Sequence, residues 1–449
     1  MPDQINTTRQ DFLDAAAPYQ ARIAALKKNQ YSDIVDGEGN QYIDLVLEGG
    51  GTLGIALLGY IYVLEQAGLR FIGIGGTSAG AVSAIALAAA GKPSESRLDK
   101  LMDELANMPM RSFVDGRKDG DSDAINVVDA WLNKRGALAK AWLTAQVLDN
   151  LHEIQALNRG DAFKNWMDQL LRRLNGEQPM TVASLRQRMN DLPDLWVCDS
   201  ALADDFPIAA LCPYTVQPDG RRQLNRHADK DQLCVISADI STESKIAFPR
   251  MANLYWSDPP SVNVAEFARA SMSIPGFFAT YKVPSRPVDD NIRGIWREAM
   301  PNWPEESLGG QFLPKVHHFV DGGVLSNFPI DAFHNSERVP LRPTFGVKLQ
   351  WDEHNHDIQN LLDVFTQSFN SARHVLDGEF INRNPDFSKL VAYIDTKEIG
   401  WLDFGMDKAT KLRLFDMGLQ SAMDFLEQFD WSNYKRIRRL LLQANLTPA

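Results

Sequence analysis

The stretch from residue 43 to residue 91 constrains the fold most strongly, because it repeats one pattern twice: an apolar strand, a cluster of glycines and an apolar helix. The first copy reads IDLVLEGGGTLGIALLGYIYVLEQAG and the second reads LRFIGIGGTSAGAVSAIALAAAG. Strongly apolar strands joined through a helix are typical of a strand–helix–strand unit in a buried parallel sheet. The sequence therefore predicts an α/β protein with a mostly parallel central sheet flanked by helices.

The second glycine cluster, GTSAG at residues 76–80, has the form G-x-S-x-G and lies between an expected strand and an expected helix. In that context the chain turns sharply, as in a nucleophile elbow, and presents Ser78 at the carboxyl edge of the sheet. Gly76 and Gly80 leave room for a strained turn, and the amides at the start of the helix favour a developing negative charge. The alternative is an ordinary glycine turn in which the serine only caps the helix.

The first glycine cluster, GGGTLG at residues 49–54, also matches the dinucleotide-binding pattern G-x-G-x-x-G between a strand and a helix. That function expects an acidic residue at the end of the following strand to bind a ribose, and this chain has the serine elbow there instead. Consecutive glycine amides can converge on an oxyanion. We therefore expect Gly49, Gly50 and Gly51 to form an oxyanion hole beside the serine. Gly54 ends the turn and supports it.

A serine nucleophile needs a base, and Asp321 is the candidate. It follows the apolar strand expected at residues 316–320 and precedes Gly322 and Gly323. It therefore lies at a strand end, where the catalytic groups of parallel sheets gather. An ordinary aspartate, with a pKa of about 3.9, is a weak base, and partial burial would raise that pKa. Asp-Gly-Gly is otherwise a common turn.

Together, the two glycine clusters and Asp321 resemble the patatin-like phospholipase family, which includes the catalytic domain of cytosolic phospholipase A2. That family has a glycine-rich oxyanion loop, a G-x-S-x-G elbow and a later D-G-G/A that carries the catalytic aspartate, and this chain has the three elements in the same order. Two further segments are similar to family blocks: ARASMSIPGFF at residues 268–278 to A-S-x-x-I-P-x-x-F, and DGGVLSNFP at residues 321–329 to D-G-G-x-x-x-N-x-P. The resemblance extends from residue 42 to residue 349.

The resemblance implies a patatin-like three-layer fold and a Ser–Asp dyad without histidine, with Ser78 as the nucleophile and Asp321 as the base. Acyl transfer by such a dyad needs neither a metal nor an organic cofactor. One residue departs from the family pattern: Leu53 stands where an arginine or lysine usually precedes the last glycine of the oxyanion loop. We expect this change to affect the rate and the substrate preference more than the fold.

A histidine could instead complete a Ser-Asp-His triad. His334 and His374 follow Asp321 in the order that α/β-hydrolases use, and His317 and His318 lie just before the aspartate. None of these histidines lies in a recognisable catalytic loop. Surface or strand-edge positions are therefore the simpler interpretation.

Charge and cysteine content narrow the function classes. The formal net charge is -12 and the pI is near 5.2, which argues against nucleic-acid binding, because that function needs a basic surface to neutralise phosphates. The three cysteines form no CxxC pair and suit a reducing cytosol better than a disulfide framework. The N-terminus lacks a signal-peptide pattern, and no apolar run is long enough to span a bilayer. We therefore expect a cytoplasmic protein that is peripheral at the inner membrane face where it meets lipid.

The chain divides into an N-terminal helical extension over residues 1–40, with a break near Pro18, and an acyl hydrolase domain over residues 41–449. Within that domain we expect a helical insertion at residues 92–190, a tryptophan-containing flap at residues 284–314 and C-terminal helices at residues 406–443. The flap and the basic tail at residues 434–442 are candidates for lipid contact. A packed insertion and a docked helix are the simpler interpretations.

The resemblance implies hydrolysis of fatty-acyl esters of lipids, of phospholipase A or lysophospholipase type. The substrate would be a glycerophospholipid or a lysophospholipid at a membrane surface. The second hypothesis is a latent or catalytically silent patatin scaffold that acts through partner binding or needs an activator, and Leu53 gives it slight support. The sequence leaves the acyl position, the head group and the oligomeric state open, a homo-oligomer included.

Overall fold

The computed structural model describes residues 7–116, 156–198, 214–225, 232–304, 311–334, 339–350, 383–396, 399 and 405–446. Within these residues, strands form one 12-stranded mixed sheet. The strands are β1 (Ile34–Val35), β2 (Gln41–Leu47), β3 (Leu69–Thr77), β4 (Trp196–Val197), β5 (Tyr214–Val216), β6 (Arg222–Leu224), β7 (Leu233–Asp239), β8 (Ser244–Phe248), β9 (Tyr281–Pro284), β10 (Val316–Asp321), β11 (Thr344–Gln350) and β12 (Val391–Asp395). The α-helices are α1 (Arg9–Ala16), α2 (Gln20–Leu26), α3 (Gly54–Gln66), α4 (Ala79–Ala89), α5 (Met102–Ala106), α9 (Asp161–Leu174), α10 (Val182–Met189), α11 (Ala265–Ser271), α12 (Asp290–Ala299), α14 (Lys408–Gln428) and α15 (Trp431–Leu446).

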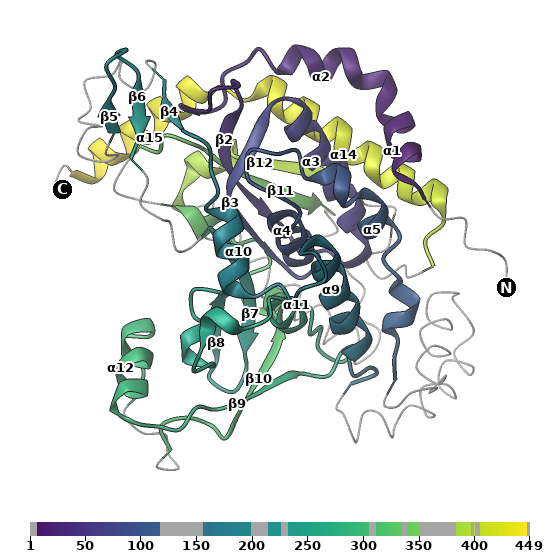
Figure 1. The fold of residues 1–449 in the computed structure, drawn as a ribbon, viewed down its shortest axis with the longest axis vertical. Helices are drawn as coiled ribbons and strands as arrows, with labels where there is room; N and C mark the ends of the chain where they lie inside the picture. The colour runs from purple at the N-terminus through teal and green to yellow at the C-terminus, as the bar shows by residue number, and fades with distance from the viewer. Residues whose placement is uncertain are drawn as a thin grey trace.

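Parallel strands form the centre of the sheet, in the order β12-β11-β2-β3-β7. The parallel pairing of β2 with β3 through the crossover helix α3 confirms the strand–helix–strand unit expected from residues 43–91. Antiparallel strands extend the sheet beside β2, through β1, β4, β6 and β5, and beside β7, through β8, β10 and β9. The sheet is therefore mixed, with mostly parallel central strands flanked by helices, as expected (Figure 1).

Helix α3 packs along the C-terminal helix α14, and α4 packs against β2, β3 and β7 (Figure 1). The backbones of α3 and α14 meet at two glycines. A Cβ added to Gly59 would overlap the Phe415 carbonyl, and a Cβ added to Gly418 would overlap the Ala56 carbonyl. Because the distance between packed helices depends on the side chains at their contact, these two glycines allow the close crossing.

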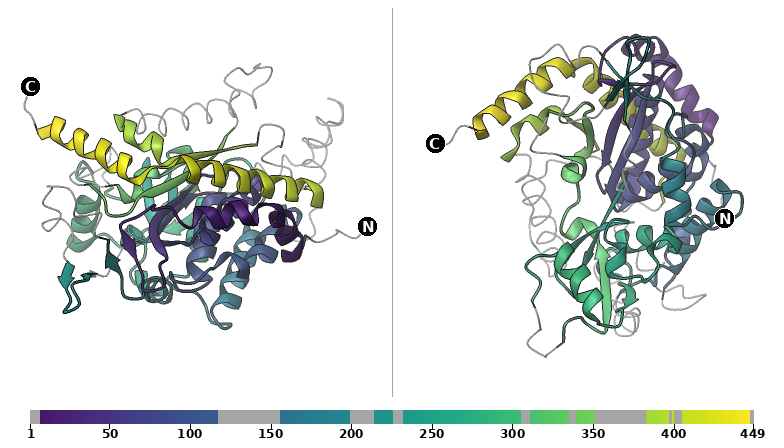
Figure 2. Two further views of the ribbon diagram at one scale, coloured as in Figure 1. Left: turned by 90° about the horizontal axis from the view of Figure 1, so that it is seen from above. Right: turned by 60° about the vertical axis from the view of Figure 1, so that its left-hand side comes forward.

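The N-terminal helices α1 and α2 lie alongside α14, as Figure 2 shows. A capping box begins α1: the Asp11 N–H donates to Thr8 Oγ1, and Asp11 Oδ2 accepts from the Thr8 N–H. Lys408 binds the same carboxylate at 2.8 Å, and these partners lower the pKa of Asp11 to about 2. A 3₁₀ turn at Ala17–Tyr19, which contains Pro18, separates α1 from α2, so the expected break is confirmed.

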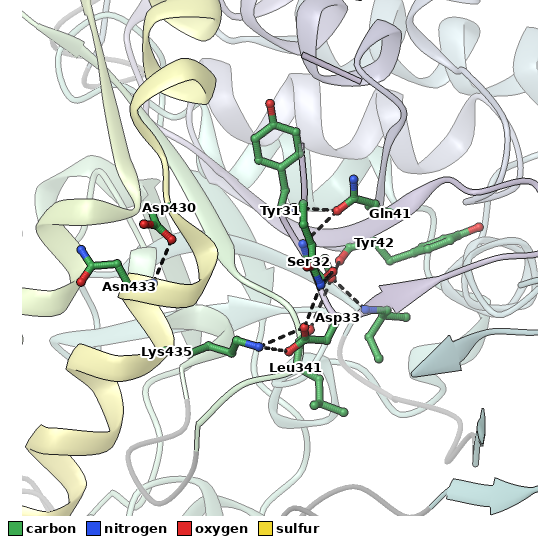
Figure 3. A network of polar contacts seen from close by, with 11 residues as sticks. Tyr31, Ser32, Asp33, Gln41, Tyr42, Leu341, Asp430, Asn433 and Lys435 are labelled. Atoms are coloured by element: carbon green, nitrogen blue, oxygen red, sulfur yellow. Dashed lines mark hydrogen bonds and ion pairs between the residues drawn. The ribbon is translucent and has the colours of Figure 1, made fainter. Parts of the chain in front are cut away.

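The basic C-terminal helix α15 is attached to the body of the protein by a buried ion pair. Figure 3 shows Lys435 Nζ donating to both carboxylate oxygens of Asp33, at 2.8 and 3.0 Å. The N–H of Asp33 donates to the Leu341 carbonyl at 2.9 Å, so the pair ties the segment before β2 to α15 and to the approach to β11. Lys435 and Arg438 are both buried. These two basic side chains therefore face the protein, which agrees with a docked helix.

The insertion and the flap are described only in part. Residues 117–155 of the expected insertion lie outside the described residues, whereas α5, α9 and α10 form helices within the range 92–190. In the range 284–314, α12 buries Trp296, whose ring stacks on His317 with 5.5 Å between centroids. Trp296 therefore packs in the interior. No helix among the described residues is long and apolar enough to cross a membrane.

The crossing of α3 and α14 predicts opposite effects for two helical Gly→Ala changes. Gly59→Ala should lower the free energy of unfolding by roughly 1–3 kcal/mol, because the new methyl group overlaps a backbone carbonyl. Gly294→Ala in α12 meets no atom within 4 Å and should raise it by about 0.5–1 kcal/mol. Urea denaturation followed by circular dichroism measures both values. Equal effects of the two changes would contradict the close crossing.

Candidate functional site

The chain makes a strained turn between β3 and α4, and Ser78 is the residue at the turn. Strand β3 continues to Thr77, and α4 begins at Ala79. Ser78 between them has φ 54° and ψ -123°. A non-glycine residue in such a conformation costs of order 1–3 kcal/mol and persists only where the surroundings hold it. The local backbone is therefore that of the expected elbow.

The glycines around the turn are required by close backbone contacts. A Cβ on Gly76 would lie 2.5 Å from the carbonyl carbon and oxygen of Gly80. A Cβ on Gly80 would overlap the carbonyl oxygen of Leu47 at the end of β2. Any larger residue at these positions would push the elbow away from β2, where the first glycine cluster begins.

Two consecutive residues at the end of α11 contact Ser78. The N–H of Ser78 donates to Ser271 Oγ at 2.9 Å, and the Ser271 hydroxyl donates to the Ile236 carbonyl at 2.6 Å. The Ser78 hydroxyl donates to Met272 Sδ at 3.4 Å. Sulfur is a weak acceptor, so this contact leaves the hydroxyl easily redirected. Ser271 thus links the elbow to β7.

Asp321 and the elbow lie on the two sides of β7. Thr77 pairs with Ile236, and Asp321 pairs with the next residue, Ser237, on the opposite edge of β7. The Asp321 N–H also donates to the Ser273 carbonyl at 2.8 Å. The segment 271–273 therefore contacts Ser78 at one end and Asp321 at the other.

The direction of the strand that carries Asp321 differs from the expectation. Asp321 does end a strand, but β10 is antiparallel to β7, so this strand runs against the parallel ones. Its pairing with Ser237, next to the Ile236 that pairs with Thr77, still places Asp321 beside the carboxyl end of β3. It reaches the elbow from the opposite direction. Periodicity could not reveal this, because the direction of β10 is seen only in its antiparallel pairing with β7 and β9.

The residues after Asp321 form a tight turn that holds its side chain. Asp321 Oδ1 accepts from the Gly323 N–H at 2.8 Å, and the side chain is buried. A Cβ on Gly322 would overlap the Ile236 carbonyl, so glycine is needed where the turn crosses β7. The turn fixes one carboxylate oxygen of Asp321.

The first glycine cluster lies against the elbow. A Cβ on Gly49 would be 2.9 Å from Ser78 Cβ, and a Cβ on Gly54 would be 3.5 Å from Ala79 Cβ. Gly51 has φ 55°, which favours glycine. Leu53, at the position where the family usually has a basic residue, is buried in the hydrophobic core. The structure therefore brings the expected oxyanion loop beside the serine.

One of the three expected oxyanion donors is already used. The Gly49 N–H donates to the Asn327 carbonyl at 3.2 Å, so Gly49 does not offer this group to a substrate. Within the described part of the chain, no acceptor binds the N–H groups of Gly50 and Gly51. The candidate donors are therefore Gly50 and Gly51.

The histidines near Asp321 have other partners. His317 is fully buried, its Nδ1 lies 2.7 Å from Asp239 Oδ2, and Tyr255 donates to the same oxygen at 3.1 Å. His318 Nδ1 is 2.9 Å from Thr280 Oγ1. His334 packs against Phe387, and burial lowers its pKa. His374 lies outside the described residues.

Sequence reasoning assigned no role to Ser271, Met272 or Asn327, although all three contact the site. The sequence could have pointed to these residues, because all three lie in the two segments that resemble the secondary blocks of the family. Their partners are distant in the sequence, so their contacts could not be inferred from spacing.

The model of the patatin-like phospholipase family matches residues 45–334, well over half of the chain. The chain belongs to this family. The patatin family accounts for the order of the oxyanion loop, the elbow and the Asp-Gly-Gly turn, and it supports a lipid hydrolase.

Among known proteins, this chain is 25% identical over 393 residues to the uncharacterized protein YqhO of Bacillus subtilis (strain 168), and the match covers 87% of this chain and 100% of YqhO. Among solved structures it is similar to VipD from Legionella pneumophila, with 14% identity, a TM-score of 0.41, and coverage of 90% of this chain and 71% of VipD. It is also similar to ExoU of Pseudomonas aeruginosa in its heterodimeric complex with SpcU, with 16% identity, a TM-score of 0.34, and coverage of 87% of this chain and 52% of the other.

Removal of the hydrogen bond between Ser271 and the strained elbow should destabilise the protein. Ser271→Ala should lower the free energy of unfolding by about 1–3 kcal/mol, because the buried Ser78 N–H loses its acceptor. Ser83→Ala, at a buried serine inside α4, should destabilise the protein less than Ser271→Ala, because alanine has the higher helix propensity. Chemical denaturation measures both. A neutral Ser271→Ala would show that the elbow does not depend on this bond.

Proposed function

We propose that this protein is a lipid acyl hydrolase of phospholipase A or lysophospholipase type, with Ser78 as the nucleophile and Asp321 as the base. The observation that carries the proposal is the placement of these two buried side chains on either side of Ile236 and Ser237 of β7. The glycine loop beside Ser78 supports it. The family supports the lipid class of the substrate.

In the proposed reaction, Asp321 takes the hydroxyl proton of Ser78 as Oγ attacks the ester carbonyl carbon. The carbonyl oxygen becomes an oxyanion, which the N–H groups of Gly50 and Gly51 stabilise. The intermediate collapses, and the alcohol leaves with the proton from Asp321. Asp321 then takes a proton from a water molecule as the water attacks the acyl-serine, and returns that proton to Ser78 Oγ as the fatty acid is released. No metal or organic cofactor takes part in these steps.

The substrate is proposed to be a glycerophospholipid or a lysophospholipid at a membrane surface. This follows from the family and from no individual side chain. The cytoplasmic location, peripheral at the inner membrane face, stays a prediction from the sequence.

The second candidate, a latent enzyme that needs an activator, is favoured by a specific observation. Ser78 is 5% exposed and Asp321 is 4% exposed, and the serine hydroxyl is bonded to Met272. A lipid must displace neighbouring groups to reach Oγ in this arrangement. Leu53 in the oxyanion loop is buried and stands where the family usually has a basic side chain. This difference also favours the latent enzyme.

The proposed dyad predicts a loss of fatty-acid release from mixed phospholipid vesicles. Ser78→Ala and Asp321→Asn should each lower the rate by roughly 10⁴-fold, because each removes one half of a unit that acts together. The controls are Ser83→Ala on α4 and Asp331→Asn, an exposed aspartate, which should retain the wild-type rate. Full activity of Asp321→Asn with an unchanged melting temperature would contradict its role as the base.

Labelling with a fluorophosphonate separates the active enzyme from the latent and silent alternatives. Labelling at Ser78 with fatty-acid release supports the proposal. Labelling without release indicates a latent enzyme, and the absence of both indicates a silent scaffold.

A further inference from the structure

We propose that Asn327 is a positioning residue that sets the direction of the Gly50 N–H, and so orients the oxyanion hole of the proposed reaction. The inference rests on the proposed function for its catalytic consequence. Its structural part, the hold of Asn327 on the glycine loop, stands on contacts of the described residues.

Asn327 binds Gly49 from both sides. Its backbone carbonyl accepts the Gly49 N–H at 3.2 Å, and its side-chain Nδ2 donates to the Gly49 carbonyl at 3.0 Å. The side chain is almost fully buried. Two hydrogen bonds from one residue therefore hold both peptide groups that flank Gly49.

The planarity of the peptide bond carries this hold to the next residue. The Gly49 carbonyl and the Gly50 N–H belong to one peptide group, and in a trans peptide they point in opposite directions. A donor that fixes the carbonyl on one side thereby fixes the N–H on the other. Because glycine backbones rotate more freely than others, this loop needs such a restraint to keep its donor aimed before a substrate arrives.

The position of Asn327 also ties the oxyanion loop to the other parts of the site. Asn327 Oδ1 lies close to two glycines. A Cβ on Gly323 would be only 2.9 Å from this oxygen, and a Cβ on Gly49 would overlap it. The amide therefore fits between one glycine of the oxyanion loop and one glycine of the Asp321 turn. The preceding Ser326 carbonyl accepts from Thr77 Oγ1 at 2.9 Å. The segment 321–327 thus contacts the elbow and the oxyanion loop and carries the proposed base.

The chemistry of the contact is specific to asparagine. The Gly49 carbonyl needs a donor, which an amide supplies and a carboxylate does not. Asn327→Asp keeps the shape of the side chain but turns an acceptor toward the Gly49 carbonyl. If Asn327 only filled space, Asn327→Asp would be the milder change and Asn327→Ala the more severe one. If it orients the peptide, both changes are severe.

The experiment measures kcat and KM for fatty-acid release by the full chain and by Asn327→Ala and Asn327→Asp. Because an oxyanion donor acts in the transition state, kcat should fall by roughly 10²–10³-fold in both variants, with KM within about threefold of wild type. The matched control is Asn40→Ala, which removes another buried asparagine side chain, bound to Asp36 Oδ2 at 2.9 Å, and should keep the wild-type kcat.

A second measurement does not depend on catalysis. Hydrogen exchange of the peptide that contains residues 48–53, followed by mass spectrometry, should accelerate at least tenfold in Asn327→Ala and stay unchanged in Asn40→Ala. Exchange at the wild-type rate would overturn the inference, as would an Asn327→Asp variant with wild-type kcat. If the wild type releases no fatty acid but Asn327→Ala still accelerates exchange, the proposed function fails and the hold on the loop is supported.

Discussion

The site depends on backbone segments that touch with no side chain between them. Gly80 lies against the Leu47 carbonyl, Gly76 against Gly80, and Gly322 against the Ile236 carbonyl. These contacts bring the end of β2 against the turn after β3, and the turn after β10 against β7, and Ser78 lies at the first of them with a positive φ. The strain is local, and hydrogen bonds from neighbouring elements offset it, so the geometry of the serine is a property of the whole sheet centre.

One short segment both holds the two proposed catalytic residues in place and buries them. The N–H of Ser78 and the N–H of Asp321 are held by Ser271 and Ser273, which are two residues apart at the end of α11. Met272 between them receives the serine hydroxyl. The same short segment therefore positions the two proposed catalytic residues and occupies the space next to the nucleophile. A ligand that moves Met272 would redirect the hydroxyl without disturbing the backbone that holds it.

Local sequence patterns predicted the features that are set by local physics. The parallel pair β2 and β3, the elbow and the break at Pro18 follow from apolar runs, glycines and proline. The pattern could not predict contacts between distant residues. The Gly49 N–H is used by Asn327, 278 residues away, and Lys435 pairs with Asp33, 402 residues away. The antiparallel direction of β10 and the burial of Lys435 and Arg438 depend on such distant partners.

A crystal structure of the protein after reaction with an alkyl fluorophosphonate tests the proposed nucleophile and oxyanion hole directly. We expect phosphorus bonded to Ser78 Oγ, with one phosphoryl oxygen about 2.7–3.1 Å from the N–H groups of Gly50 and Gly51. The Gly49 N–H should remain on the Asn327 carbonyl, and Met272 should have left the hydroxyl. An adduct on another residue, or a phosphoryl oxygen bound by Gly49 in place of Gly50, would contradict the proposed site.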